Sequence, residues 1–253
     1  MDKKKPSKKT EIDSTVLLFA HQVKSGLTAI KWSLKMICND DFGKITKEQK
    51  DIIEKTIGKN EALLSLINNL LHASAIEDGK YLYDKSLASI ENIIEYVMDY
   101  SKEEATRKKI KIEFKKSEGN MPKIMLDKEM VKLAVQNIFD NALKYTPANG
   151  EVTIFLRNDK KNIEIQVQDS GIGIPENQKD KLFNRFFRAT NAVKMNSEGS
   201  GVGLFITKNI IEANNGKIWF ESEAHKGTSF YISFPINSDG IEQSQEKGYN
   251  NKK

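Results

Sequence analysis

The pattern of apolar and polar residues changes its rhythm once along the chain. Up to about residue 79, apolar residues recur at alternating spacings of three and four, as in helices that pack into bundles. Beyond residue 80, helical stretches alternate with short segments of strict apolar–polar alternation, which is typical of half-buried strands. The sequence therefore predicts an N-terminal helical hairpin followed by an α+β sandwich, in which helices cover one face of a mixed sheet.

The first predicted helix spans residues 12–37 and carries one continuous apolar seam. Its members are Val16, Ala20, Val23, Leu27, Ile30, Leu34 and Ile37. After a turn at 39–43, Thr46 and Gln49 form a capping box that opens a second helix with an equally broad apolar stripe. Two such helices cannot cover each other's apolar faces, so we expect a homodimer in which two hairpins form a four-helix bundle.

His21 lies away from this seam, about 140° around the first helix at about 100° per residue. Its neighbours on that face are Lys24, Ser25 and Thr28. We therefore expect its imidazole to be exposed on a helix whose opposite side is buried. Neutral imidazole carries a free lone pair near pH 7, which makes it a candidate nucleophile.

The second part of the chain predicts a helix at 89–107, a strand at 110–114 and a long helix capped by Asp127. Later strands are expected at 152–157, 163–168, 217–222 and 229–234, with a helix at 202–213. The predicted organisation is a basic disordered leader (1–11), the helical hairpin (12–79), an α+β domain (80–236) and a disordered polar tail (237–253).

Composition narrows the classes of function. The 253 residues are 38% hydrophobic and 30% charged, which describes a soluble chain able to bury a core. The 40 basic and 35 acidic residues are mostly interleaved, which favours a solvated surface over nucleic-acid binding. The one cysteine, Cys38, excludes an internal disulfide. With no apolar run long enough to span a bilayer, we expect a cytoplasmic protein, associated with a membrane only if an upstream sensor segment has been removed.

A polar stripe on the long helix is the first candidate for chemistry. Asn137, Asn141 and Lys144 follow one another at spacings of four and three, so all three side chains point the same way. Amide oxygens suit Mg²⁺ and a lysine ammonium suits phosphate. The stripe is therefore arranged to hold an anion together with a metal ion, although a solvated helix would show the same pattern.

Two glycine-rich blocks follow. Asp169 ends an alternating strand and precedes Gly171 and Gly173, so its carboxylate can accept a hydrogen bond from an exocyclic amine such as that of adenine. The second block, 199–204, opens a helix whose free N–H groups suit phosphate. Between them, 188–198 has the small, polar composition of a mobile lid.

In this order, the three blocks resemble the N, G1 and G2 boxes of the sensor histidine kinase ATP-binding domain, the HATPase_c or GHKL domain with the Bergerat fold. The segment 182–188 resembles the F box of that family, and Gly227-Thr228 its late Gly-Thr pair. Upstream, 19–27 resembles the H box of the HisKA-type dimerisation and phosphoacceptor domain. The resemblance extends over about residues 12–236.

The resemblance assigns roles to individual residues. It implies that Asp169 reads adenine, that Asn141 ligates Mg²⁺, and that Lys144 and the third-block glycines hold phosphate. It implies that the ATP site consists of Asn137, Asn141, Lys144, Tyr145, Asp169, Gly171, Gly173, Arg185, Phe186, Arg188, Gly199, Gly201, Gly203, Leu204 and Thr228. It places His21, Gln22 and Ser25 at the phosphorylated centre, with His21 as the phosphorylated residue.

The implied activity is that of a protein-histidine kinase of a bacterial two-component system, with ATP and Mg²⁺ as cofactors. Such a kinase phosphorylates itself on His21, passes the phosphoryl group to a response regulator receiver domain, and can also act as that regulator's phosphatase. Two departures from the family pattern stand out, because Gln22 replaces an acidic residue and Ser25-Gly26 replaces Thr-Pro. The alternatives are a GHKL-type ATPase, against which the His21 hairpin argues, and a catalytically weakened signalling dimer.

Overall fold

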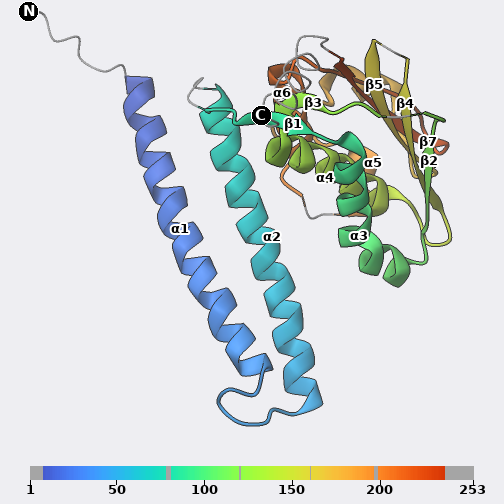
Figure 1. Ribbon diagram of the computed structural model, residues 1–253. Helices are drawn as coiled ribbons and strands as arrows, with labels where there is room; N and C mark the ends of the chain where they lie inside the picture. The colour runs from blue at the N-terminus through green and yellow to red at the C-terminus, as the bar shows by residue number, and fades with distance from the viewer. Residues whose placement is uncertain (1–7, 78–80, 120, 160, 197–198, 237–253) are drawn as a thin grey trace, which may run out of the picture. The chain divides into compact units, whose positions relative to one another are not determined.

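The computed structural model describes residues 8–77, 81–119, 121–159, 161–196 and 199–236 (Figure 1). The chain divides into two compact units, Met1–Tyr81 and Leu82–Lys253. The first is a helical hairpin and the second a mixed sheet with helices, so the predicted fold class is confirmed. No helix among the described residues is long and apolar enough to cross a membrane.

The hairpin consists of α1 (Lys8–Cys38) and α2 (Lys47–Glu77). α1 begins four residues before the predicted hairpin boundary, inside the expected leader. The predicted capping box forms, since the backbone N–H of Thr46 donates to Gln49 Oε1 at 2.8 Å and that of Gln49 to Thr46 Oγ1 at 3.3 Å. An ion pair between Lys31 of α1 and Glu61 of α2, at 2.7 Å, links the two helices.

Much apolar surface of the described hairpin stays uncovered within one chain. Ala20 and Ile67 are buried. Several larger apolar side chains are 40–65% exposed, namely Ile30, Trp32, Met36, Ile52, Leu63 and Leu66. Exposed apolar surface of this extent is typical of an interaction face.

The second unit is built on a five-stranded sheet in the order β2-β4-β5-β7-β6. Its strands are β2 (Lys111–Lys116), β4 (Glu151–Asn158), β5 (Asn162–Asp169), β6 (Lys217–Glu223) and β7 (Gly227–Pro235). β2 pairs with β4 in parallel and the other neighbours are antiparallel, so the sheet is mixed as predicted.

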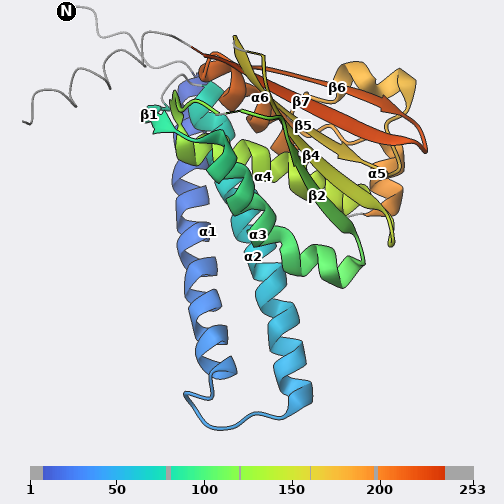
Figure 2. The ribbon, with the colours of Figure 1, turned by 45° about the vertical axis from the view of Figure 1, so that its right-hand side comes forward.

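Helices α3 (Ile90–Lys108), α4 (Lys128–Tyr145) and α6 (Gly203–Ala213) lie side by side over one face of this sheet (Figure 2). They cover the strand side chains that alternation predicts to be inward, among them Ile154, Ile165, Val167 and Ile232. The Ser89 and Asp127 side chains cap α3 and α4 by accepting from Asn92 N and Met130 N. The core is therefore a single apolar layer between helices and sheet.

A second, two-stranded sheet was not predicted in full. β1 (Lys85–Ala88) begins inside the expected linker or edge strand at 80–86 and ends two residues after it. It pairs antiparallel with β3 (Ile124–Asp127). β3 has four residues, runs directly into α4, and is too short to show a clear alternation. Short helices at η1 (Glu176–Lys181) and α5 (Thr190–Met195) complete the described elements.

Candidate nucleotide site

The predicted polar stripe lies on α4. The opposite, apolar face of this helix packs into the core and fixes the helix in place. Ile138, Phe139 and Leu143 are buried in the core. The side chains of Asn137, Asn141, Lys144 and Tyr145 are instead half-buried, at the margin of the core. The stripe is thus presented by a rigid helix, with amides and an ammonium accessible from one side.

Asp169 ends β5 and its side chain points to the helix-covered face, with an exposed fraction of 8%. Its Oδ1 accepts hydrogen bonds from the backbone N–H groups of Gly171 at 2.8 Å and Thr228 at 3.2 Å. Burial raises the pKa of this carboxyl from 3.8 to about 6, against the opposing effect of the two hydrogen bonds. The two hydrogen bonds fix the orientation of the carboxyl group, which can accept a hydrogen bond from a ligand amine.

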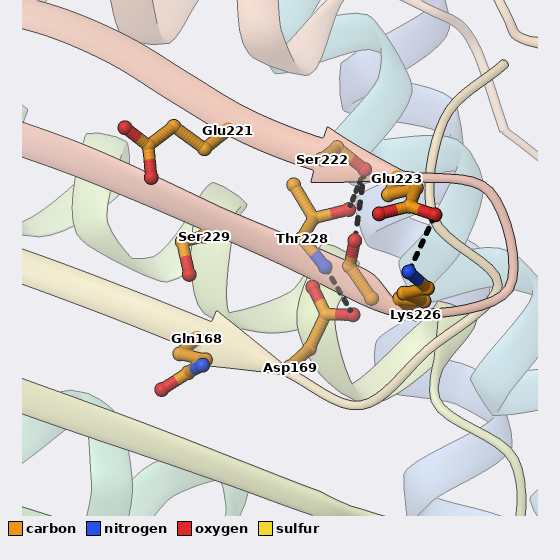
Figure 3. Close-up of a pocket in the computed structure, with 9 residues that line it drawn as sticks. Gln168, Asp169, Glu221, Ser222, Glu223, Lys226, Thr228 and Ser229 are labelled. Atoms are coloured by element: carbon orange, nitrogen blue, oxygen red, sulfur yellow. Dashed lines mark hydrogen bonds and ion pairs between the residues drawn. The ribbon is translucent and has the colours of Figure 1, made fainter. Parts of the chain in front are cut away.

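The turn between β6 and β7 is locked against the loop that follows Asp169. Gly227 has φ +99°, and a Cβ there would overlap the carbonyl oxygen of Asp169. Ser222 Oγ accepts from Ile174 N at 2.9 Å. The same oxygen lies 2.9 Å from Thr228 Oγ1 (Figure 3). A Cβ on Gly173 would likewise overlap the carbonyl oxygen of Glu223. Both glycines are therefore required by close backbone contact.

A cavity of about 310 Å³ lies at this end of the sheet. The ends of β5, β6 and β7 line it, with Asp169, Ser222 and Thr228 among the lining residues (Figure 3). Of the predicted site residues, only Asp169 and Thr228 line this cavity. Gln168, Ser229 and Glu221 also line the cavity, and these paired strand positions alternate with Asp169, so the cavity extends toward the sheet face that the helices do not cover. The remaining predicted residues are connected by other contacts.

The first of these contacts joins α4 to the Asp169 loop. The carbonyl oxygen of Tyr145 accepts from Ile172 N at 3.1 Å. A Cβ on Gly171 would stand 2.5 Å from the same oxygen, closer than real side chains approach. The C-terminal end of α4 and the predicted adenine loop are therefore in direct backbone contact.

The second joins α4 to the last glycine-rich block. A Cβ on Gly199 would stand 3.0 Å from Lys144 Nζ, and one on Gly203 would stand 3.7 Å from Asn137 Cγ. Gly201 has φ +68° and its carbonyl oxygen accepts from Phe186 N at 3.0 Å. The glycines let the chain pass close over the stripe. Leu204 follows in the first turn of α6 and is half-buried.

Arg188 organises the predicted lid. Its guanidinium donates to the carbonyl oxygens of Ala192 at 3.5 Å, of Gly199 at 3.4 Å and of Asn196. Arg185 lies over the ring of Phe186, 4.9 Å from its centroid, and Phe186 is 60% exposed with φ +65°. The positive charges of Lys144 and Arg188 thus flank Gly199, where the notional Cβ is 3.5 Å from Arg188 Cζ.

The segment contains a short helix that composition alone did not reveal. Asn191, at the start of α5, donates to the carbonyl oxygens of Gly173 at 2.8 Å and Ile172 at 3.4 Å. Gln178 and Thr190 exchange two hydrogen bonds, at 2.9 and 3.0 Å. The predicted lid is therefore fastened at its N-terminal end to the loop that follows Asp169. Asn191 and Gln178 were not among the predicted site residues.

The protein oxygens at this site fit Mg²⁺ only together with the phosphate oxygens of a bound nucleotide. Among the described residues, no three His, Cys, Asp or Glu side chains come together as a metal site. Asn137 and Asn141 offer amide oxygens on one stripe, beside cations suited to phosphate. Mg²⁺ commonly binds one or two protein oxygens plus phosphate oxygens and water.

The predicted phosphorylated centre lies on α1. The backbone of His21 belongs to this helix, but its side chain lies outside the described residues, so its expected exposure stays a prediction. Gln22 and Ser25 are exposed. Thr28, on the predicted face, donates to the carbonyl oxygen of Lys24 at 2.8 Å.

Residues 126–238 match the model of the histidine kinase-, DNA gyrase B- and HSP90-like ATPase family, HATPase_c. This segment contains α4, the Asp169 loop and the glycine-rich block. Residues 126–238 are a HATPase_c domain. Beyond this domain, the chain is similar to proteins named sensor kinases over 87–88% of its length.

Two curated relatives illustrate this. The chain is 26% identical over 88% of its length to the adaptive-response sensory kinase SasA of Gloeothece citriformis. It is 29% identical over 87% of its length to the sensor histidine kinase WalK of Bacillus subtilis. It spans only 58% and 36% of the lengths of these two proteins.

Solved structures agree on the fold. Full-length ShkA, solved in complex with AMPPNP, matches 88% of this chain and 45% of its own with a TM-score of 0.71 at 22% identity. The catalytic domain of the histidine kinase ThkA matches 60% of this chain and 97% of its own, with a TM-score of 0.53 at 27% identity. The likeness to ShkA therefore extends over most of the chain and concerns its fold.

Proposed function

We propose that this chain is an ATP-dependent protein-histidine kinase that phosphorylates itself on His21 and passes the phosphoryl group to an aspartate of a response regulator receiver domain. The observation that carries the proposal is the convergence of three separate segments. Asn137 and Lys144 of α4 meet the glycines at 199 and 203, and the end of α4 meets the Asp169 loop. The relatives of the chain are named sensor kinases.

In the proposed complex, the carboxyl group of Asp169, on the helix-covered face of the sheet, accepts a hydrogen bond from the adenine amine. Lys144, Arg188 and the N-terminal turn of α6 hold the phosphates. Asn141 ligates Mg²⁺, which neutralises phosphate charge when bound. The predicted lid at 188–198, in which Arg188 donates to the carbonyl oxygens of Ala192 and Asn196, closes over the nucleotide and excludes water.

Phosphoryl transfer begins with the neutral imidazole of His21. One ring nitrogen attacks the γ-phosphorus while the bond to the bridging oxygen breaks, so that ADP leaves with that electron pair. The N–H proton on the other ring nitrogen passes to solvent. Gln22 can orient the ring through a hydrogen bond but cannot accept the proton as a carboxylate would. We therefore expect slow autophosphorylation.

The other two histidines support the choice of His21. His225 lies in the β6–β7 turn with φ +66°, and its backbone N–H donates to the carbonyl oxygen of Ile172 at 2.9 Å. His72 is half-buried in α2 and packs edge-on against Tyr81, with ring centroids 6.1 Å apart. Burial, with a smaller effect of the Lys24 charge, lowers the pKa of His72. Both therefore have structural roles.

We further propose that two hairpins form a homodimer. The exposed apolar side chains of α1 and α2 support this, because a second hairpin would remove them from water.

ATP labelled at the γ-phosphorus tests the proposal against its alternatives. Label retained on the protein supports a kinase. Release of free phosphate without labelled protein would instead indicate a GHKL-type ATPase, and neither product would indicate a binding scaffold. Asn141→Ala is the matched control, because it leaves His21 in place and removes the proposed metal ligand.

A further inference from the structure

One polar side chain of α6 is buried without an obvious structural reason. The buried residues of this helix are Ile206, Thr207, Ile210 and Ile211, and Thr207 has an exposed fraction of 0%. A valine would have the same shape. Burying a hydroxyl in such surroundings is unfavourable unless it is hydrogen-bonded.

The hydrogen-bond partner of Thr207 lies on another helix. Asn137 Nδ2 on α4 donates to Thr207 Oγ1 at 3.5 Å. Three threonines in the longer helices behave differently, since Thr28, Thr56 and Thr106 each donate to the carbonyl oxygen four residues earlier at 2.8 Å. The Thr207 hydroxyl therefore serves a contact across the α4–α6 interface.

Gly203 completes the surroundings of the Asn137 amide. It precedes Thr207 by one helical turn, so both residues face the same way. A Cβ on Gly203 would stand 3.7 Å from Asn137 Oδ1 and 3.9 Å from Nδ2. The amide thus lies against a surface made of Gly203 and Thr207, with its nitrogen bonded to the hydroxyl and its oxygen left beside the first turn of α6.

We propose that Thr207 is a positioning residue, which holds the side-chain amide of Asn137 so that Oδ1 is presented to the bound nucleotide and its metal ion. The inference rests on the proposed function for the nucleotide and adds a determinant of the site. With its nitrogen engaged by Thr207, Asn137 offers the ligand an acceptor oxygen, which suits a magnesium–phosphate group. An amide turned the other way would offer an N–H group instead.

Two substitutions separate positioning from packing. Thr207→Val keeps the shape and removes the hydroxyl, so we expect an unchanged or higher denaturation midpoint and about three- to tenfold weaker binding of magnesium–AMPPNP by calorimetry. Thr207→Ser keeps the hydroxyl and removes the methyl group, so we expect a lower midpoint and affinity within about twofold of wild type. Stability and affinity should therefore change independently.

The background of Asn137→Ala provides the control for the contact itself. If Thr207 acts through the amide, adding Thr207→Val to Asn137→Ala should change affinity by less than about twofold. An equal loss in both backgrounds would overturn the proposal. Equal weakening by the Val and Ser variants, in step with lower stability, would also overturn it and indicate a packing role.

A nucleotide-free readout separates this proposal from the proposed function. In ¹⁵N-labelled protein, the side-chain amide signals of Asn137 should shift in Thr207→Val and stay near their wild-type positions in Thr207→Ser. Unchanged signals in Thr207→Val would show that the hydroxyl does not hold the amide. If wild type binds no magnesium–AMPPNP, the proposed function fails, and with it the role of Thr207 toward nucleotide, whatever the amide signals show.

Discussion

At the scale of single residues, Asp169 combines burial with two backbone hydrogen bonds, and its raised pKa leads to a testable pH dependence. The buried carboxyl binds its proton more tightly in the folded state, with a pKa of about 6, than in the unfolded chain, where it is near 3.8. The free energy of unfolding should therefore fall as pH rises from about 4 to 6. The difference corresponds to roughly 3 kcal/mol.

Asp169→Asn removes this titration, so the two proteins should diverge between pH 4 and pH 6 in denaturant titrations. The same substitution should weaken nucleotide binding about ten- to a hundredfold at pH 7.5, because a hydrogen bond to a charged group is lost. Parallel stability profiles, or calorimetry showing wild-type affinity in the variant, would contradict the role given to Asp169.

Gln22 gives a second prediction at this scale. Gln22→Glu would place a proton acceptor next to His21, and such a group is typically worth about 10²–10⁴ in rate, of which solvent at an exposed site supplies part. Single-turnover autophosphorylation should accelerate roughly tenfold or more, with unchanged ATP affinity. The rate should also fall less steeply from pH 8 to pH 6. Coincident rates across this range would show that another step, such as lid closure, is limiting.

Some single-residue roles could be predicted from sequence and others could not. The caps at Thr46 and Asp127 were predictable because both partners lie within three residues. Thr207 and Asn191 act on residues 70 and 18 or 19 positions away, so their roles appear only in the folded chain. The predicted nucleotide-binding residues could be found in sequence because they lie in recognisable blocks. That these blocks approach one another closely is seen only in the contacts of their glycines in the structure.

At the scale of elements, alternation predicted the strands of the large sheet because one face of each is covered by helices. β3 was not predicted because four residues are too few for a periodic signal. α5 was not predicted because its segment has the composition of a polar loop. Gly173, in the loop that follows β5, leaves no room for a Cβ, whereas Gly26, within a helix, does.

Gly173→Ala should therefore be strongly destabilising. Gly173 has φ +62°, and a Cβ would overlap the carbonyl oxygen of Glu223. Gly26→Ala is the matched control, since Gly26 lies in α1 with nothing within 4 Å of a notional Cβ. Helix propensity predicts a gain of about 1 kcal/mol there. Thermal denaturation in which both variants melt alike would contradict this account of the adenine loop.

At the scale of the whole molecule, the proposed homodimer can be tested on the isolated hairpin. Residues 11–79 alone should form a helical dimer, because side chains such as Ile52 and Leu63 are 64% and 50% exposed in the single hairpin. Ile52→Glu together with Leu63→Glu should shift the dimer toward monomer, while Ser33→Glu, on an exposed polar position, should not. A folded wild-type monomer in sedimentation at micromolar concentration would refute the four-helix bundle.

The central claim is that the HATPase_c domain delivers phosphate to the hairpin, and one measurement tests it most directly. The full chain is incubated with magnesium and γ-labelled ATP, and the protein-bound label is tested for stability to acid and base. We predict a label that is acid-labile and base-stable and that is absent from His21→Ala, whose ATP affinity should remain within a few-fold of wild type. Label of the same chemistry on His21→Ala, or no label on wild type that binds ATP, would contradict the account.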